Sequence, residues 1–233
     1  MGTKRVTTGE LKIALAAALN LPERKIDYPH LRIQQAGYIA KGKRGRGGVD
    51  VSPRDSATTL IAVLGAFISD EVLIAVRDFS GLQVAHTAHI IHAPSVDGRM
   101  DTEGWSDEST AWQFAGYNIP HLQGLPAGHT FADALTALIE AARDGAFEAA
   151  IMAASPNTDI ASHGIEVTFS GPEPAAVIEI DLTSNGRSYK ETATYLLTDP
   201  TFSIERHSAF KIAVTIDHQS VYAVAKLFRE RTR

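Results

Sequence analysis

The chain has 233 residues, of which 44% are hydrophobic and 21% charged, a composition that suits a globular protein of one large or two modest domains. It contains no cysteine, which excludes disulfide scaffolds, thiolate nucleophiles and cysteine-ligated zinc or iron–sulfur centres. The longest apolar stretch, 59–67, is about half of the roughly 18 residues that a membrane-spanning helix requires, and no apolar run follows the basic residues near the N-terminus, so we expect a cytoplasmic protein.

The net charge of −5 is divided unevenly along the chain. Residues 1–54 hold eleven Lys and Arg against four acidic residues, a local charge of +7, and the remaining 179 residues carry −12. A basic segment on an acidic body is typical of a protein that binds a polyanion, and nucleic acid is the first candidate. The alternative is a solvated basic surface without a partner.

A capping box opens the first predicted helix. Thr7 precedes Glu10 by three residues, the spacing at which the two side chains bond reciprocally to the first helical turn. Leucines then recur at every fourth residue with alanines between them. This pattern predicts a short amphipathic helix over 8–19.

Two prolines predict two further helices. Pro22 and Pro29 each suit the first position of a helix, where the N–H that proline lacks would have no helical partner. We therefore expect one helix over 22–28 and a third over 29–36, which Gly37 ends as a left-handed cap.

A β-hairpin with a basic tip is predicted after the third helix. Short β-prone stretches at 38–41 and 49–51 flank a glycine-rich loop. This loop, 41–48, carries four cations: Lys41, Lys43, Arg44 and Arg46. Ser52 then suits the N-cap of a fourth helix over 53–67.

The order helix, helix, helix, hairpin, helix over residues 5–67 resembles the winged helix-turn-helix domains of bacterial and phage regulators. The resemblance implies that the helix 29–36 enters the major groove of DNA and that the wing, 41–48, contacts the backbone or the minor groove. Arg and Gln can pair with guanine and adenine edges, whereas Lys and Arg neutralise phosphates. The residues expected to bind DNA are His30, Arg32, Gln34, Gln35, Lys41, Lys43, Arg44 and Arg46.

The middle of the chain, 69–125, is expected to be a helical and loop connector. A helix is predicted after 69–71, and the acidic, turn-rich stretch 93–110 is expected to be a surface loop. Three histidines stand at intervals of three: His86, His89 and His92. On a helix they would share a face and could hold zinc, whereas on a strand they would divide between two faces. A histidine-ligated metal hydrolase is therefore one alternative function.

Residues 126–233 predict an α+β unit. A helix is expected to begin at Thr130 and to stop at Gly145, and a last helix is expected around Val221. Between these helices, a hydrophobic period of two predicts four strands: 165–169, 178–182, 189–197 and 210–216. Asn185 and Gly186 form the strongest hairpin signal of the sequence. We therefore expect an α+β protein, with an N-terminal winged helix-turn-helix, a helical connector and a C-terminal antiparallel sheet with flanking helices.

The sequence as a whole predicts a transcriptional regulator of bacterial or phage type that binds specific sites on double-stranded DNA. Residues 1–68 would bind DNA, and residues 126–233 would mediate dimerisation or bind a protein or effector. A homodimer is expected because one small domain makes few contacts with DNA. No motif for a catalytic site, a metal or a cofactor is found. A protein-interaction module, such as a phage-encoded inhibitor of a host protein, is the alternative from another class.

Overall fold

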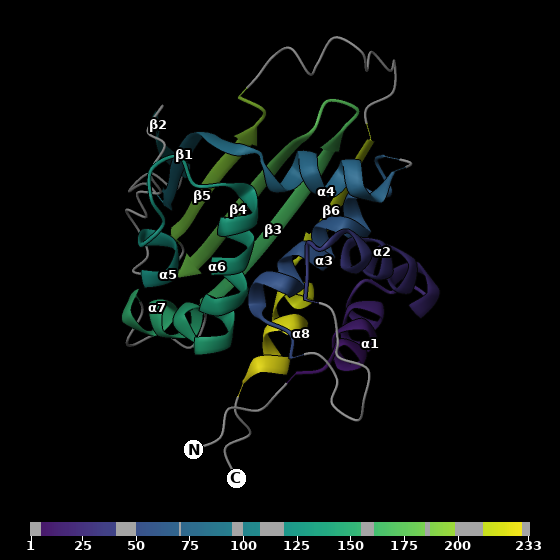
Figure 1. Ribbon diagram of the computed structural model, residues 1–233. Coiled ribbons are helices and arrows are strands. Elements are labelled where there is room, and N and C mark those ends of the chain that lie inside the picture. The colour runs from purple at the N-terminus through teal and green to yellow at the C-terminus, as the bar shows by residue number, and fades with distance from the viewer. Residues whose placement is uncertain are drawn as a thin grey trace.

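The computed structural model describes residues 6–40, 50–69, 71–94, 100–107, 119–154, 161–184, 187–198 and 212–229. These residues form one antiparallel sheet with helices packed against one of its faces (Figure 1). The strands lie in the order β2-β1-β5-β4-β3-β6. No described helix meets the length and hydropathy that crossing a membrane requires.

The bounds of the elements are as follows. The helices are α1 (Thr8–Ala18), α2 (Glu23–Ala36), α3 (Pro53–Gly65), α4 (Val72–Ser80), α5 (Pro120–Gln123), α6 (Phe131–Asp144), α7 (Ala146–Ala154) and α8 (His218–Phe228). The strands are β1 (Gln83–Pro94), β2 (Met100–Asp107), β3 (Ala161–Gly171), β4 (Ala175–Ser184), β5 (Arg187–Leu196) and β6 (Ile212–Asp217).

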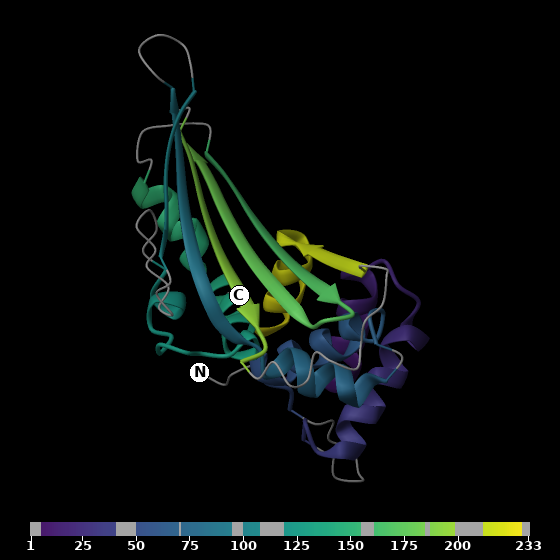
Figure 2. The ribbon, with the colours of Figure 1, turned by 90° about the horizontal axis from the view of Figure 1, so that it is seen from above.

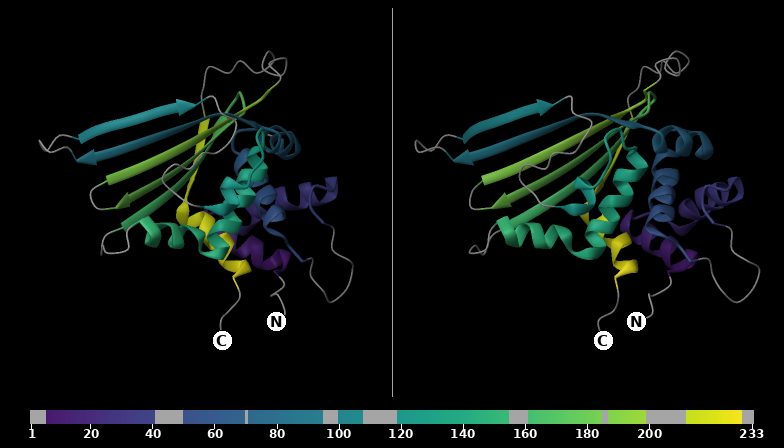
Figure 3. Two further views of the ribbon diagram at one scale, coloured as in Figure 1. Left: turned by 90° about the vertical axis from the view of Figure 1, so that its left-hand side faces the viewer. Right: turned by 60° about the vertical axis from the view of Figure 1, so that its left-hand side comes forward.

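The helices lie on one face of the sheet (Figure 3), and the alternation of side chains along the strands turns the buried ones toward them. Every second side chain of β3 is buried, and the residues opposite on β4 are buried as well: Ile165 with Ile180, Val167 with Ile178, and Phe169 with Ala176. The residues between them are more exposed and, apart from Val177, polar. On this other face Thr168 hydrogen-bonds Thr215, with 2.9 Å between the two hydroxyl oxygens, and Lys190 pairs with Glu179. A period of two therefore turns the apolar side chains toward the helices.

An aromatic cluster joins the sheet to the helical layer. Phe169 on β3 lies between Phe79 of α4 and Phe131 of α6, with ring centroids 5.4 and 5.2 Å away. Tyr195 on β5 lies 5.4 Å from Phe131, and its hydroxyl is 2.9 Å from Nε2 of His129. Edge-to-face and tilted contacts of this kind add to the stability that burial provides.

The N-terminal helices are part of the same helical layer. The Ser220 hydroxyl at the start of α8 donates to the Ala18 carbonyl of α1 at 3.4 Å, and Arg54 of α3 lies 2.5 Å from the Asp133 carboxylate of α6. The buried residues form one continuous cluster that runs from Val6 to Ala225. A functional division of the chain near residues 68 and 125 stays a prediction.

The helices expected at 22–28 and 29–36 are one helix, α2, and the expectation of two was wrong. Pro29 lies inside α2, where it cannot donate a hydrogen bond to the Lys25 carbonyl. The helix continues because Ile26, Ile33 and Pro29 itself are buried, and packing outweighs the cost of the proline. Two helices rather than three therefore precede the basic segment, and the winged helix-turn-helix arrangement is not confirmed.

The predicted wing lies outside the described residues, but its flanks are described. Before the wing, residues 38–40 do not form a strand. After it, the described residues 50 and 51 do not pair with residues 38–40. Asp50 instead forms an isolated antiparallel bridge with Thr7, and the Val51 amide donates to the Val6 carbonyl at 2.8 Å. The chain after the basic segment is thus attached to the residues before α1.

The stretch 93–110 was expected to be a surface loop, and that expectation was wrong for its central part. Residues 100–107 form β2, which pairs with β1 from Pro94 opposite Met100 to Thr87 opposite Asp107. The sequence of β2 is polar and has little β propensity, so it is the pairing with β1 that stabilises this strand. The connector therefore contributes two strands to the sheet.

Other predicted elements are confirmed. Capping boxes begin α1, α3 and α6 at Thr7, Ser52 and Thr130. The four C-terminal strands and the last helix are present, and Gly145 ends α6 in the left-handed conformation. Ser184 lies opposite Arg187, so β4 and β5 pair up to the two predicted turn residues, Asn185 and Gly186, which lie outside the described residues.

Candidate nucleic-acid interface

The outward face of α2 is exposed and basic. This helix lies on the side of the helical layer far from β1 and β2 (Figure 1, Figure 2). Its inner side chains, such as Ile26 and Ile33, are buried. At about 3.6 residues per turn, the side chains opposite them share one face of the helix. All of these residues are exposed: Arg24, Lys25, Tyr28, Leu31, Arg32 and Gln35.

Among the described residues, no acid forms an ion pair with the cations on this face. Glu23 adjoins Arg24 in the sequence, and Asp27 is paired with Lys12 of α1, with 2.6 Å between Nζ and Oδ1. Within the described part of the chain, Arg24, Lys25 and Arg32 have neither an ion pair nor a side-chain hydrogen bond. Cations that lack a partner attract anionic ligands more strongly than paired ones.

Two of the predicted base-reading residues, Arg32 and Gln35, lie on this face and are exposed. Gln34 lies at its edge and is half-buried. Its side-chain amide donates to the Ala40 carbonyl at 3.3 Å, just before the basic segment begins. The Gln34 side chain thus bonds to the backbone of the segment that follows α2. Lys41, Lys43, Arg44 and Arg46 lie outside the described residues.

His30, which was also predicted to bind DNA, is buried and does not lie on the exposed face of α2 that holds Arg32 and Gln35. Its side chain is 4% exposed, with Nδ1 3.3 Å from the Thr59 hydroxyl. That hydroxyl donates to the Asp55 carbonyl at 2.8 Å, so His30 must donate through Nδ1. Nε2 is then a buried acceptor without a partner, and burial lowers the pKa of His30. The three-residue spacing from Ile33 places His30 on the buried side of α2.

The row of three histidines lies on strand β1 and not on a helix. The side chains of His89 and His92 lie outside the described residues, and the backbone of 83–94 is a strand, so the three histidines do not share one face of a helix. His86 is exposed. Among the described residues, no three His, Asp or Glu side chains are grouped so that they could hold a metal ion. The geometry of β1 removes the shared face on which a histidine-ligated metal site depended.

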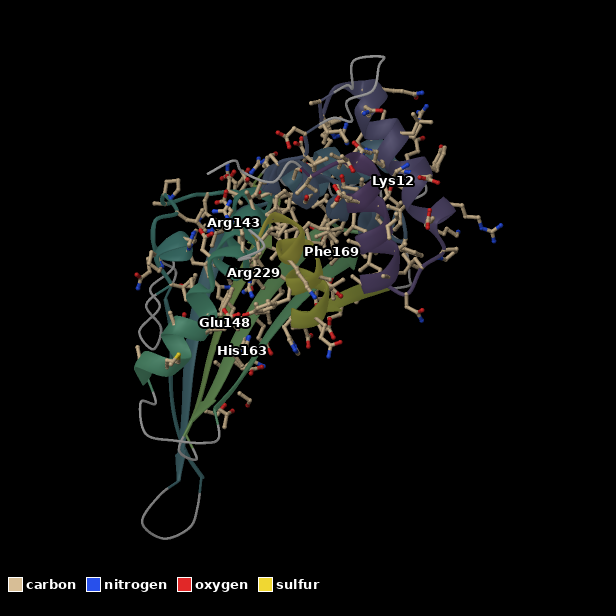
Figure 4. All side chains as sticks on the ribbon, turned by 90° about the horizontal axis from the view of Figure 1, so that it is seen from below. Lys12, Arg143, Glu148, His163, Phe169 and Arg229 are labelled. Carbon is tan, nitrogen blue, oxygen red and sulfur yellow. The ribbon has the colours of Figure 1, made fainter. Side chains whose placement is uncertain are left out.

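A second polar cluster lies where α7, β3 and α8 meet (Figure 4). His163 Nε2 is 2.9 Å from the Tyr222 hydroxyl, and the His163 ring stacks on Phe147 with centroids 6.2 Å apart. Arg229 donates to Glu148 at 2.8 Å and lies over the Tyr222 ring at 5.9 Å. Sequence reasoning missed this cluster because its members are far apart along the chain and share no motif.

The electrostatics of this cluster favour a neutral phenol and a neutral imidazole. Burial, followed by the proximity of His218, lowers the pKa of His163. Burial and then the neighbouring Glu148 raise the pKa of Tyr222. Burial, the largest single influence, acts to raise the pKa of Glu148, but the hydrogen bond and charge of Arg229 together with a backbone hydrogen bond and the nearby His163 outweigh it and lower that pKa. The Tyr222 hydroxyl and His163 Nε2 are therefore joined by a hydrogen bond between two neutral groups.

Comparison with known proteins finds no match: no protein-family model, no curated protein and no solved structure resembles the chain. The function is therefore argued from the residues of this chain alone.

Proposed function

We propose that the protein is a cytoplasmic regulator that binds double-stranded DNA through the outer face of α2 and the basic segment 41–48. The observation that carries this proposal is the exposed row of three cations on α2, Arg24, Lys25 and Arg32, which form no ion pair with any described residue. Duplex DNA carries one negative charge per about 1.7 Å of its axis, so an uncompensated basic helix face matches it well.

The dimensions of α2 suit the major groove. A helix with its side chains is about 10–12 Å wide, and the major groove is about 12 Å wide. In this arrangement Arg32 and Gln35 would contact base edges, while Arg24 and Lys25, about two to three turns earlier, would contact phosphates. His30 and Gln34 have no part in this contact because both side chains are bonded within the protein.

The basic segment is attached close to this face. It begins five residues after the end of α2, and it adds four cations to the three on the helix. The rest of the chain, residues 55–233, carries −12, which disfavours contact of that part with DNA and so favours approach along α2. A homodimer that reads paired half-sites would supply the additional contacts that specific binding requires.

The proposal is tested by measuring the affinity for a duplex by fluorescence anisotropy between about 50 and 200 mM salt. We expect affinity to fall steeply with salt, and we expect Lys43→Ala/Arg44→Ala/Arg46→Ala to flatten the slope of log K against log salt by about two to three units. Lys226→Ala, at an exposed position on α8, is the matched control and should change nothing. Absence of binding at low salt, or an unchanged slope in the triple variant, would contradict the proposal.

A further inference from the structure

A pocket with a volume of about 490 Å³ lies between α2, α3 and α4. Its floor contains Val63 and Val72, which are 1% and 5% exposed. Its mouth contains two aromatic side chains that are largely in water, Tyr28 at 61% and Phe67 at 44% exposure. An apolar hollow bordered by exposed aromatic rings is typical of a binding site, because such rings gain free energy when a ligand covers them.

The charged residues of the pocket are Arg24 and Lys25, and no acidic residue lines it. Neither cation has an ion pair in the described part of the chain. The pocket therefore combines an apolar floor, an aromatic mouth and a net positive rim. A ligand that matches all three has a flat apolar body and one anionic group.

We propose that this pocket binds a small aromatic anion, a carboxylate or a sulfonate. The aromatic body would lie between Tyr28 and Phe67 over the apolar floor, and its anionic group would bond to Arg24 and Lys25. The volume falls within the range of about 300–1,000 Å³ that small-molecule pockets occupy, which favours a small ligand over a peptide or a helix.

The inference does not depend on DNA binding, although the pocket shares Arg24 and Lys25 with the proposed DNA-binding face. An aromatic anion on these two cations would neutralise the charges that DNA would use. Occupation of the pocket would therefore weaken DNA binding, which makes the pocket a site for an effector. Binding of the anion can be measured without DNA, so failure of one proposal is distinguishable from failure of the other.

Isothermal titration calorimetry of the full chain with 1-naphthoate tests the proposal, and the neutral 1-naphthamide serves as the ligand control. We expect saturable binding of the naphthoate and binding of the amide that is weaker by about tenfold, equivalent to the loss of one good charge-assisted contact. Arg24→Gln/Lys25→Gln should weaken naphthoate binding by a similar factor and should leave amide binding unchanged. Arg32→Gln, which removes a cation from the same helix but outside the pocket, should bind naphthoate as the wild type does.

Two variants test the location. Ala66→Leu adds volume to the lining and should abolish binding, and Tyr28→Ala removes an exposed aromatic wall and should weaken binding without affecting folding, since the Tyr28 ring is mostly in water. Equal affinity for the naphthoate and the amide, an absence of saturable naphthoate binding, or unchanged affinity in both location variants would overturn the proposal.

Discussion

Lys12 of α1 and Asp27 of α2 form an ion pair, with 2.6 Å between Nζ and Oδ1, so one of the two acids near the exposed cations of α2 is paired with a cation of another helix. Asp27 is three residues from Arg24 and therefore next to it on the helix surface. The pair thus influences the electrostatic potential of the whole outer face. Its own contribution to folding is small, because Asp27 is half exposed.

The ion pair gives the first prediction. Lys12→Gln frees the negative charge of Asp27 beside the cations and should weaken DNA binding by a factor of about two to five, whereas Asp27→Asn should strengthen it by a similar factor. If Lys12 acts only through Asp27, the double variant should bind as Asp27→Asn does, whereas independent effects of the two charges would return the affinity to near the wild-type value. Anisotropy titrations at one low salt concentration measure all four proteins, and equal affinities in the four would refute this coupling.

The second prediction concerns sequence readout. Arg32→Ala and Gln35→Ala should each cost about 1–3 kcal/mol of discrimination at one base position and should leave the salt slope almost unchanged, because base contacts release few counterions. Selection of bound fragments from a random duplex library, compared between wild type and variants, measures the change. His30→Asn should not alter the selected sequence in protein that remains folded, since His30 is buried.

The third prediction concerns the close approach of Gly171 at the end of β3 to Ile68 after α3. A Cβ on Gly171 would stand 2.0 Å from Ile68 Cγ2, and the β-branched Ile68 has few alternative rotamers. Gly171→Ala should therefore lower the free energy of unfolding by about 1–3 kcal/mol, measured by urea denaturation. Adding Ile68→Ala should relieve the overlap, so the two changes should be less destabilising together than their sum.

Gly9→Ala is the control for this experiment. Gly9 lies inside α1, where a Cβ would meet only the Thr7 hydroxyl at 4.0 Å. Alanine there should stabilise the helix by about 0.5–1 kcal/mol. A Gly171→Ala protein as stable as the wild type would show that β3 and the turn after α3 are not in contact as described.

The fourth prediction is a loss of stability in mild acid. Burial is the main cause that lowers the pKa of His30, His129 and His163 below the ordinary value of 6.5. Between pH 6.5 and the lowered pKa values of the folded state, these histidines bind protons in the unfolded chain but not in the folded chain. The free energy of unfolding therefore has its full value above pH 6.5 and falls as the pH decreases. Urea denaturation at a series of pH values should show this slope.

His30→Phe isolates one contribution to that slope. The phenyl ring keeps most of the volume and removes the titrating group along with the unpartnered Nε2. The variant should lose less stability than the wild type between neutral pH and about pH 5, the range in which histidine changes charge. An identical pH dependence in the two proteins would show that His30 titrates normally in the folded state.

Local signals in the sequence predicted much of the fold. The capping boxes at Thr7 and Thr130 mark where helices begin, because the cap is made by residues three positions apart. The β4–β5 hairpin was predictable for the same reason, since its turn residues and its alternating strands are contiguous. Such features depend on neighbours along the chain and not on tertiary contacts.

The features that sequence reasoning missed depend on contacts between distant residues. Pro29 is a strong local signal for a new helix, yet burial against α3 keeps α2 continuous through it. The polar β2 becomes a strand because β1 pairs with it. At the candidate site, helical spacing alone was enough to predict that Arg32 and Gln35 are exposed. The burial of His30 could not be predicted in this way, because it depends on packing against Thr59 of α3, which is distant in the sequence.

The measurement that tests the central claim most directly is the salt dependence of duplex binding by Arg24→Gln/Lys25→Gln, compared with that of the wild type and of Lys226→Gln. If the outer face of α2 contacts the phosphates, the double variant should bind at least about tenfold more weakly at low salt, and its slope of log K against log salt should be shallower by about two units. Circular dichroism should show that both variants are folded. A double variant with the affinity and slope of the wild type would contradict the account.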